Sequence, residues 1–412
     1  MVTHKKLVFC LLFGAFLLFL PSAPASADSG RYLIKSTKGF WKNAFGVRHV
    51  FDVGFTSELS DFQIRLAKMF GVEIEPVSVL QILPEEAVAP PETNTDKPTN
   101  AESHSVQGRG KPPVTTRYQP SDQTPWGVEV IYGDSNILTT SGGTGVNVAI
   151  LDTGIYSSHP DLARRVSQCK DFTNQRTPII NGKCEDKNGH GTHVAGIVAA
   201  DAGVDGEGIF GIAPEAELFV YKVCGNNGSC YADDIAAALN TAVSEGANIV
   251  NMSFGSNQQS LLIKNAIDSA ANAGLLLVAA AGNDGPFEDS IDYPAAYASV
   301  MAIGAINKFL DITDWSSRGI NEDTTPNVIE DRDIEFAAPG EYIESTWTNG
   351  GYVIHSGTSM ASPFIAGLAA KYWQTGADEP GPATRNFLHS LATDLLPPED
   401  DNGSGLGLPQ VK

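Results

Sequence analysis

The chain has 412 residues, a hydrophobic fraction of 42% and a formal net charge of −21 at pH 7. This length and apolar content suffice for one large buried core with a smaller unit beside it. The strongly acidic balance argues against nucleic acid and against anionic membranes as partners, because both would repel the chain.

Residues 1–27 predict a secretory signal peptide. A basic stretch at residues 4–6 precedes an apolar run at 7–20, and the small residues 25–27 offer a cleavage site. The run is short for a membrane span, and an uncleaved anchor is the alternative interpretation. No later stretch is long enough to span a bilayer. We therefore expect a secreted, extracellular protein with no membrane association after signal cleavage.

Residues 28–83 predict a small α+β domain. Strand patterns at 31–35, 50–55 and 72–76 alternate with an amphipathic helix at 58–70. The predicted apolar face of this helix consists of Leu59, Phe62, Leu66 and Met69. An ordinary accessory domain is one interpretation of this unit, and its position before the larger domain disfavours it.

Residues 84–120 differ in composition from both neighbours. They are rich in Pro, Thr, Glu, Ser and Gly and poor in large apolar side chains. Such a composition predicts a disordered linker, here also a candidate processing region.

Residues 121–412 predict an α/β domain with a doubly wound, mostly parallel sheet flanked by helices. Strand-like apolar runs alternate with helical patterns along this part of the chain. The strands are expected at 146–151, 218–223, 248–253, 275–280 and 299–303, and helices at 233–245 and 260–273.

Three polar residues stand at element ends in this domain. Asp152 closes an apolar strand, and His190 opens a small-residue helix within the sequence NGHGTHVAG. Ser359 lies in the sequence GTSMASP, where we expect Pro363 in the first turn of an apolar helix. Taken alone, Ser359 would be a helix cap, and Asn283 in the turn GNDG would be an ordinary turn residue.

In this chain order the three motifs resemble the subtilisin family of serine proteases, from about residue 122 to the end. The resemblance implies a serine endopeptidase that hydrolyses proteins and peptides through an acyl-enzyme intermediate. Ser359 would attack, His190 would carry the proton and Asp152 would orient the imidazole. The side chain of Asn283 and the backbone N–H of Ser359 would form the oxyanion hole.

The same resemblance gives residues 28–83 a role as an inhibitory propeptide. Such a propeptide aids folding, inhibits its own enzyme from within the same chain, and is removed by self-processing of the zymogen. The mature amino terminus would then lie within 84–121.

The resemblance also outlines a groove that binds the substrate backbone. The residues assigned to it are Ser253, Phe254, Gly255, Ala280, Ala281, Gly282 and Asp292. Asp292 falls at the floor of the first specificity pocket, where a carboxylate would favour Lys or Arg before the cut bond. The alternative is a solvated Asp292 that points away from the pocket.

A structural Ca²⁺ site is implied in the same way. Hard oxygen ligands from distant segments suit Ca²⁺ and hold loops in place. The implied ligands are Asp122, Asp161, Gly203, Asp205, Glu207 and Ile209. Unpaired surface acids are the alternative in so acidic a chain.

Four cysteines remain once Cys10 leaves with the signal peptide, and an even number in a secreted chain favours disulfides. Three pairings are possible. We favour the local one, in which Cys169 pairs with Cys184 and Cys224 pairs with Cys230. Zinc is disfavoured because the spacing lacks a CxxC pattern.

Two other functions remain open at this stage. One is a processing protease of narrow specificity, and the other is a catalytically silent binding protein on the same scaffold. In each case we expect a monomer.

Overall fold

The computed structural model describes residues 30–83, 118–321, 328–395 and 401–412. The predicted signal peptide and nearly all of the predicted linker lie outside these residues. The chain divides into two compact units, residues 1–78 and residues 79–412. Each unit is described by itself.

The first unit is an α+β domain, in agreement with the sequence pattern. Its elements are β1 (Gly30–Ile34), α2 (Gly39–Phe45), β2 (Val50–Phe51), β3 (Gly54–Leu59), α3 (Asp61–Met69) and β4 (Ile74–Pro76). The strands form an antiparallel sheet in the order β2-β3-β1-β4. A small core joins the sheet to the helices through Ile34, Trp41, Phe45, Phe55, Leu59 and Ala67.

Helix α3 begins three residues later than its pattern predicted. Ser60 caps it: the Ser60 hydroxyl accepts from the backbone N–H of Gln63, and the side-chain oxygen of Gln63 accepts from the backbone N–H of Ser60. The predicted apolar face is half right: Leu59 is buried and Leu66 packs against the core, whereas Phe62 and Met69 are exposed. Ala67 is the buried residue of the helix.

The second unit contains an α/β sheet in which the described residues form eight strands, in the order β15-β14-β13-β11-β6-β9-β7-β8. All neighbours pair in parallel except the edge strand β8, which is antiparallel to β7. The predicted doubly wound, mostly parallel sheet is therefore confirmed. The strands are β6 (Asn147–Asp152), β7 (Val166–Asp171), β8 (Ile180–Asn181), β9 (Glu217–Lys222), β11 (Ile249–Met252), β13 (Leu276–Ala280), β14 (Met301–Ile306) and β15 (Phe336–Pro339).

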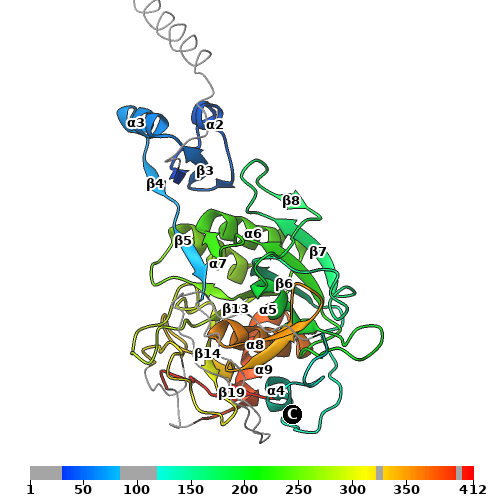
Figure 1. Cartoon of the computed structure of the whole chain (residues 1–412). Helices are drawn as coiled ribbons and strands as arrows, with labels where there is room; N and C mark the ends of the chain where they lie inside the picture. The colour runs from blue at the N-terminus through cyan, green and yellow to red at the C-terminus, as the bar shows by residue number, and fades with distance from the viewer. Residues whose placement is uncertain (1–29, 84–117, 322–327, 396–400) are drawn as a thin grey trace, which may run out of the picture. The chain divides into compact units, whose positions relative to one another are not determined.

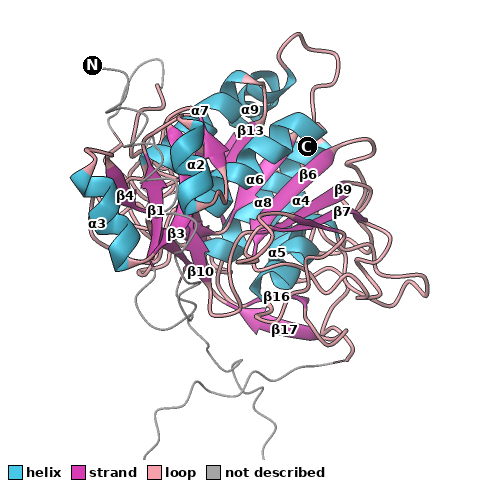
Figure 2. Ribbon diagram, turned by 90° about the horizontal axis from the view of Figure 1, so that it is seen from above, coloured by secondary structure: helices cyan, strands magenta, loops and turns pink. Residues whose placement is uncertain are grey.

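Helices cover both faces of this sheet, which explains why every residue of its central strands except Asn147 is buried. Figure 1 shows α6 (Ala232–Glu245) and α7 (Leu261–Asn272) on one side of β6 and β13, with α5 (His190–Ala199) and α8 (Thr358–Lys371) on the other. Figure 2 shows the same sheet from above with its helices around it. The remaining helices are α4 (Trp126–Tyr132) and α9 (Pro380–Leu391).

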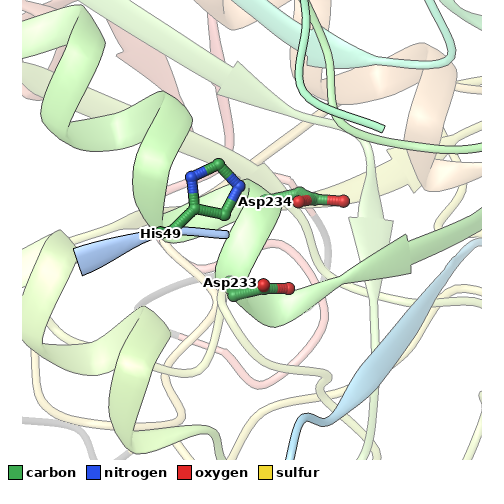
Figure 3. A group of neighbouring side chains, drawn as sticks. All are labelled: His49, Asp233 and Asp234. Carbon is green, nitrogen blue, oxygen red and sulfur yellow. The ribbon is translucent and has the colours of Figure 1, made fainter. Parts of the chain in front are cut away.

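Helix α6 begins with two acidic residues, Asp233 and Asp234, in its first turn. Both are labelled in Figure 3, together with His49 of the first unit. Carboxylates at this end of a helix face the positive end of the helix dipole.

The described residues of the second unit also form three small sheets. One joins β5 (Val79–Ile82) to β10 (Ser229–Tyr231) and β12 (Phe254–Gly255), with β5 in the middle. The others pair β16 (Ile343–Thr346) with β17 (Tyr352–His355), and β18 (Ala392–Thr393) with β19 (Leu408–Pro409).

Two disulfides, Cys169–Cys184 and Cys224–Cys230, are present. The local pairing is thus the one that the structure contains. Among the residues that the structure describes, no helix combines the length and the apolar character needed to cross a bilayer.

Candidate active site

The carboxyl ends of adjacent parallel strands bring the first site residues together. Asp152 is the last residue of β6, Ser253 follows the end of neighbouring β11, and Asn283 lies three residues after the end of β13. Because parallel strands end at the same edge of a sheet, all three residues lie at that edge.

Asp152 and His190 form a direct hydrogen bond. The Nδ1 of His190 lies 2.8 Å from Oδ1 of Asp152, and the two side chains are 1% and 0% exposed. The backbone N–H of Thr153 also donates to Oδ1 of Asp152, at 2.7 Å. The carboxylate thus holds the imidazole in one orientation, with Nε2 directed away from the carboxylate.

A proline inside helix α8 shapes the serine site. We predicted Pro363 in the first turn, but α8 begins at Thr358 and Pro363 is its sixth residue, so that prediction is wrong. Proline has no N–H to bond the carbonyl four residues earlier, which here belongs to Ser359. That carbonyl instead accepts the Ser253 hydroxyl at 3.0 Å. The proline therefore frees the Ser359 carbonyl to bond the end of β11.

Ser359 is the second residue of α8 and is completely buried. Its hydroxyl donates to the carbonyl of Ser253 at 3.2 Å, and the cap position is Gly357, without a side-chain cap bond. The interpretation of Ser359 as a helix cap is therefore wrong. Helix α8 packs against α5, which begins at His190.

The amide of Asn283 is oriented by Thr358. Its Oδ1 accepts the Thr358 N–H at 3.0 Å and the Thr358 hydroxyl at 2.8 Å. Its Nδ2 lies on the side of Gly357, since a carbon added to that glycine would be 3.2 Å from Nδ2. An N–H donor is thus presented beside the start of α8, where the helix dipole is positive.

Two of the residues predicted for the groove, Phe254 and Gly255, pair with a strand from an earlier part of the same chain. Strand β5 pairs antiparallel with β12, with Ile82 opposite Phe254 and Gln81 opposite Gly255. On its other edge β5 pairs with β10. A segment of the chain itself therefore occupies the place where a substrate backbone is expected to bind.

Asp292 lies between the two predicted walls of the pocket. Its N–H donates to the carbonyl of Ala281 at 2.8 Å. A carbon added to Gly255 would be 2.8 Å from Oδ2 of Asp292 and 3.0 Å from Cδ2 of Leu83, and one added to Gly282 would be 3.1 Å from Oδ2. Asp292 is only 4% exposed, so the alternative of a solvated side chain is wrong.

Burial raises the pKa of Asp292 to about 7, and the nearby carboxylate of Asp284 acts in the same direction. The carboxyl therefore changes charge near neutral pH.

Asp161 is the best fit to a cation ligand among the predicted ones. It is 1% exposed, and its Oδ1 accepts no hydrogen bond from the described residues. Its Oδ2 accepts from the Ile209 N–H at 2.9 Å and the Tyr352 hydroxyl at 2.8 Å. A carbon added to Gly203 would be 3.2 Å from Oδ1 of Asp161 and 3.1 Å from Oδ1 of Asp205, so both oxygens face this loop.

The other predicted calcium ligands already take part in hydrogen bonds within the chain. The carbonyl of Gly203 accepts from Arg164 at 2.7 Å, and the carbonyl of Ile209 accepts from Ala202 at 3.0 Å. Glu207 donates its N–H to Asp205, and Asp122 accepts from the N–H of Thr124. The carboxylate oxygens of Asp161 and Asp205 fit a hard cation. The Arg164 guanidinium lies nearby, at the Gly203 carbonyl, and its positive charge would repel such a cation.

Sequence reasoning missed Asp186, which is buried just before the His190 helix. Its Oδ1 accepts from the N–H groups of Asn188 and Gly189 and from the Thr153 hydroxyl, and its Oδ2 accepts from Thr192. It thus ties the turn that carries His190 to the residue after Asp152. The sequence signal was an Asp followed two residues later by Asn and Gly, a pattern typical of side-chain-stabilised turns.

The chain is similar in sequence to known proteins. The sequence profile of the Subtilase family matches residues 143–407. A subtilisin of Bacillus sp. (strain TA39) is 40% identical over 392 residues, covering 89% of this chain and 88% of the relative. An M-protease of Shouchella clausii (strain KSM-K16) is 34% identical, covering 84% and 80%.

Two solved structures are similar as well. A psychrophilic protease has a TM-score of 0.68 at 45% identity, and Sphericase has a TM-score of 0.67 at 43% identity. Each alignment covers 71% of this chain and 99% of the other. The chain therefore belongs to the subtilase family and is a subtilisin-like serine endopeptidase.

Proposed function

We propose that the chain is a secreted zymogen whose mature form hydrolyses peptide bonds through Asp152, His190 and Ser359. The observation that supports this proposal is the hydrogen bond from Nδ1 of buried His190 to Asp152, at 2.8 Å. Asp152 ends β6, and the Ser359 hydroxyl bonds the carbonyl of Ser253, which follows the neighbouring strand β11. The Ser359 hydroxyl would attack the substrate carbonyl while His190 takes its proton.

The oxyanion that forms would be bound by Asn283 and by the N–H of Ser359. Thr358 holds the carbonyl end of the Asn283 amide, which leaves Nδ2 as the end that can donate to the oxyanion. Because these donors are fixed before the reaction, they stabilise the developing charge without reorganisation. The proton would then pass from His190 to the leaving amine.

Residues 28–83 would act as the propeptide, with β5 as its inhibitory tail. Ile82 pairs with Phe254, so continuing the antiparallel register by one residue would bring Leu83 opposite Ser253, whose carbonyl accepts the Ser359 hydroxyl. Leu83 would therefore occupy the position directly before the cut bond. While the tail stays bound, protein substrates cannot enter the groove.

The test of this function is hydrolysis of a chromogenic peptide by the secreted enzyme after the amino-terminal region has been removed. We expect turnover that is lost when Ser359 is replaced. A processed, folded enzyme without any hydrolysis would favour a silent binding protein, whereas cleavage of only one or two sequences in a peptide library would favour a narrow processing protease.

We further propose that Asp292 selects basic residues before the cut bond in a pH-dependent manner. Above its pKa, which is raised to about 7, the carboxyl is ionised and attracts Lys or Arg; below it the carboxyl is neutral and suits Leu. The ratio of kcat/KM for Arg over Leu peptides is expected to rise about tenfold or more from acid to alkaline pH.

The matched control for this prediction is Asp292→Asn, which keeps the shape of the side chain and removes its charge. The variant is expected to show a low Arg preference that does not change with pH. An equal pH dependence of the ratio in both enzymes would refute the role of Asp292.

Finally, we propose a structural Ca²⁺ held by Asp161 and Asp205. The carboxylate oxygen of Asp161 that faces the loop at residues 203–208 carries the argument. Calcium at about 100 times its dissociation constant would stabilise the fold by about 2.7 kcal/mol. Adding a chelator is therefore expected to lower the Tm of an inactive variant, and Asp161→Asn is expected to abolish that difference. Equal Tm values with calcium and with chelator would contradict the site.

A further inference from the structure

A loop closed by the disulfide Cys224–Cys230 forms one side of the groove. The two α-carbons are 4.1 Å apart and the cysteines are six residues apart. Inside the loop, Gly225 donates to the carbonyl of Ser229 at 2.8 Å, and Gly228 donates to the carbonyl of Gly225 at 2.9 Å. Two glycines in so short a segment would leave it flexible without the disulfide.

One end of this loop contacts the strand that occupies the groove. Cys230 lies opposite Leu80 in the pairing of β10 with β5, and the carbonyl of Gly228 accepts the N–H of Ile82 at 2.9 Å. Gly228 has φ +83, and a carbon added to it would be 2.6 Å from Cγ1 of Ile82. Only a glycine allows this close approach without displacing the bound strand.

The other end of the loop is bonded to the catalytic residues. The N–H of Cys224 donates to the backbone carbonyl of Asp152 at 3.1 Å. The carbonyl of Asn226 accepts from the side chain of Asn188 at 3.1 Å, and Asn188 accepts the backbone N–H of His190 at 3.2 Å. The loop thus joins the edge that pairs with the bound strand to the backbone that carries Asp152 and His190.

We propose that the Cys224–Cys230 disulfide positions extended substrates: it holds Gly228 and β10 in register with Asp152 and His190. The proposal rests on the proposed function, because it assumes that a substrate binds in the same position and register as β5. Without the disulfide, the loop would have to be ordered whenever a peptide binds, and this ordering opposes binding. This ordering weakens the binding of peptides that are long enough to pair with β10. It does not affect a substrate that has a single residue before the cut bond.

The experiment compares two substrates and two disulfides. The variant Cys224→Ser with Cys230→Ser is tested beside Cys169→Ser with Cys184→Ser, which removes the disulfide outside the groove. The substrates are the p-nitroanilide of Leu-Gln-Ile-Leu, the sequence of residues 80–83, and an ester of acetyl-leucine.

Loss of Cys224–Cys230 is expected to raise KM for the tetrapeptide by about 5- to 50-fold and to leave kcat nearly unchanged. The upper limit is the entropy cost of closing a loop of seven residues, converted to a ratio of affinities. Hydrolysis of the ester by this variant, and of both substrates by the Cys169 and Cys184 variant, is expected to stay near wild type. An unchanged tetrapeptide KM, or equal losses on both substrates, would overturn the proposal.

Two further variants keep the proposal testable if the serine pair does not fold. The pair Cys224→Ala with Cys230→Ala leaves no buried hydroxyl, and Gly228→Ala keeps the disulfide but displaces Ile82. Both are expected to show the same rise in tetrapeptide KM without loss on the ester. Absence of ester hydrolysis in the wild type would instead count against the proposed function, so the two failures are distinguishable.

Discussion

Replacing Ser359 by alanine is expected to lower kcat on a chromogenic peptide by about a million-fold, the magnitude already known from a subtilisin that lost its serine or its histidine. The physical reason is that the neighbouring hydroxyl in α8, that of Thr358, is bonded to Asn283 and cannot take over the attack. Steady-state kinetics on the processed enzyme measure this loss. Asn283→Leu should cost about 100- to 1000-fold, again as known from a subtilisin.

The control for this prediction is Ser362→Ala. Ser362 lies one turn further along α8, is also buried, and bonds the hydroxyl of Ser253 at 3.0 Å. Its replacement removes a hydrogen bond and no reacting group, so turnover is expected to remain close to wild type. If Ser362→Ala lost activity and Ser359→Ala kept it, the assignment of the nucleophile would be wrong.

Replacing Glu335 by glutamine is expected to destabilise the second unit by about 3 to 5 kcal/mol, because the largely buried charge of Arg385 would lose its counter-charge. Glu335 is 0% exposed and lies directly before β15. It accepts from Nε of Arg385 at 2.7 Å and lies 2.7 Å from Nε2 of His389, two residues one turn apart on α9. The expected fall in Tm is on the order of 10 °C, measured in a Ser359→Ala background to prevent self-digestion.

The contribution of Glu335 depends on pH. Burial alone would raise its pKa, but the charge of Arg385 and the bonds from His389 and Arg385 outweigh burial and hold the pKa below its usual value. A depressed pKa in the folded state gives stability that is present above the unfolded value, about 4.3, and is lost as pH falls through the folded value. The Tm difference between the wild-type side chain and the Glu335→Gln variant should therefore shrink in acid.

A double variant separates two contributions to the free energy of unfolding: the penalty for burying one charge without its counter-charge, and the net contribution of the ion pair. Glu335→Leu with Arg385→Leu removes both charges and is expected to lose less stability than Glu335→Gln alone. Equal or greater loss in the double variant would mean that the apolar environment does not tolerate removal of the pair.

Much of the site followed from patterns that are local in sequence. The apolar run that ends at Asp152 and the turn after β13 that carries Asn283 both identify strand ends, and parallel pairing brings such ends to one edge. The small-residue helix opening at His190 was equally visible. These features depend on about ten neighbouring residues or fewer, so the sequence was sufficient to find them.

Features that depend on distant partners could not be predicted in the same way. The place of Pro363 inside α8 is stabilised by Ser253, which lies 106 residues before Ser359. Arg385, the partner of Glu335, is 50 residues away on helix α9. Single-sequence patterns record which side chains are apolar, but they do not record which buried polar groups will meet.

The two exposed apolar side chains of α3 show a second reason why a prediction from the sequence was wrong. Phe62 and Met69 follow a helical spacing, yet the helix begins only after the Ser60 cap and presents Ala67 to the core. The residues of α3 that pack on the core are Ile64, Leu66 and Ala67, so the buried face is centred on a stripe beside the one that contains Phe62 and Met69. The sheet that the helix packs against decides between two neighbouring stripes, and the spacing of apolar residues alone does not.

The most direct test of the catalytic assignment is labelling of the processed enzyme with a phosphonate that traps activated serines, followed by mapping of the modified peptide. The account predicts one phosphonyl group per chain, on Ser359, and none after His190→Ala, because the hydroxyl would lose its base. Label on another residue, or no label on an enzyme that hydrolyses peptides, would contradict it.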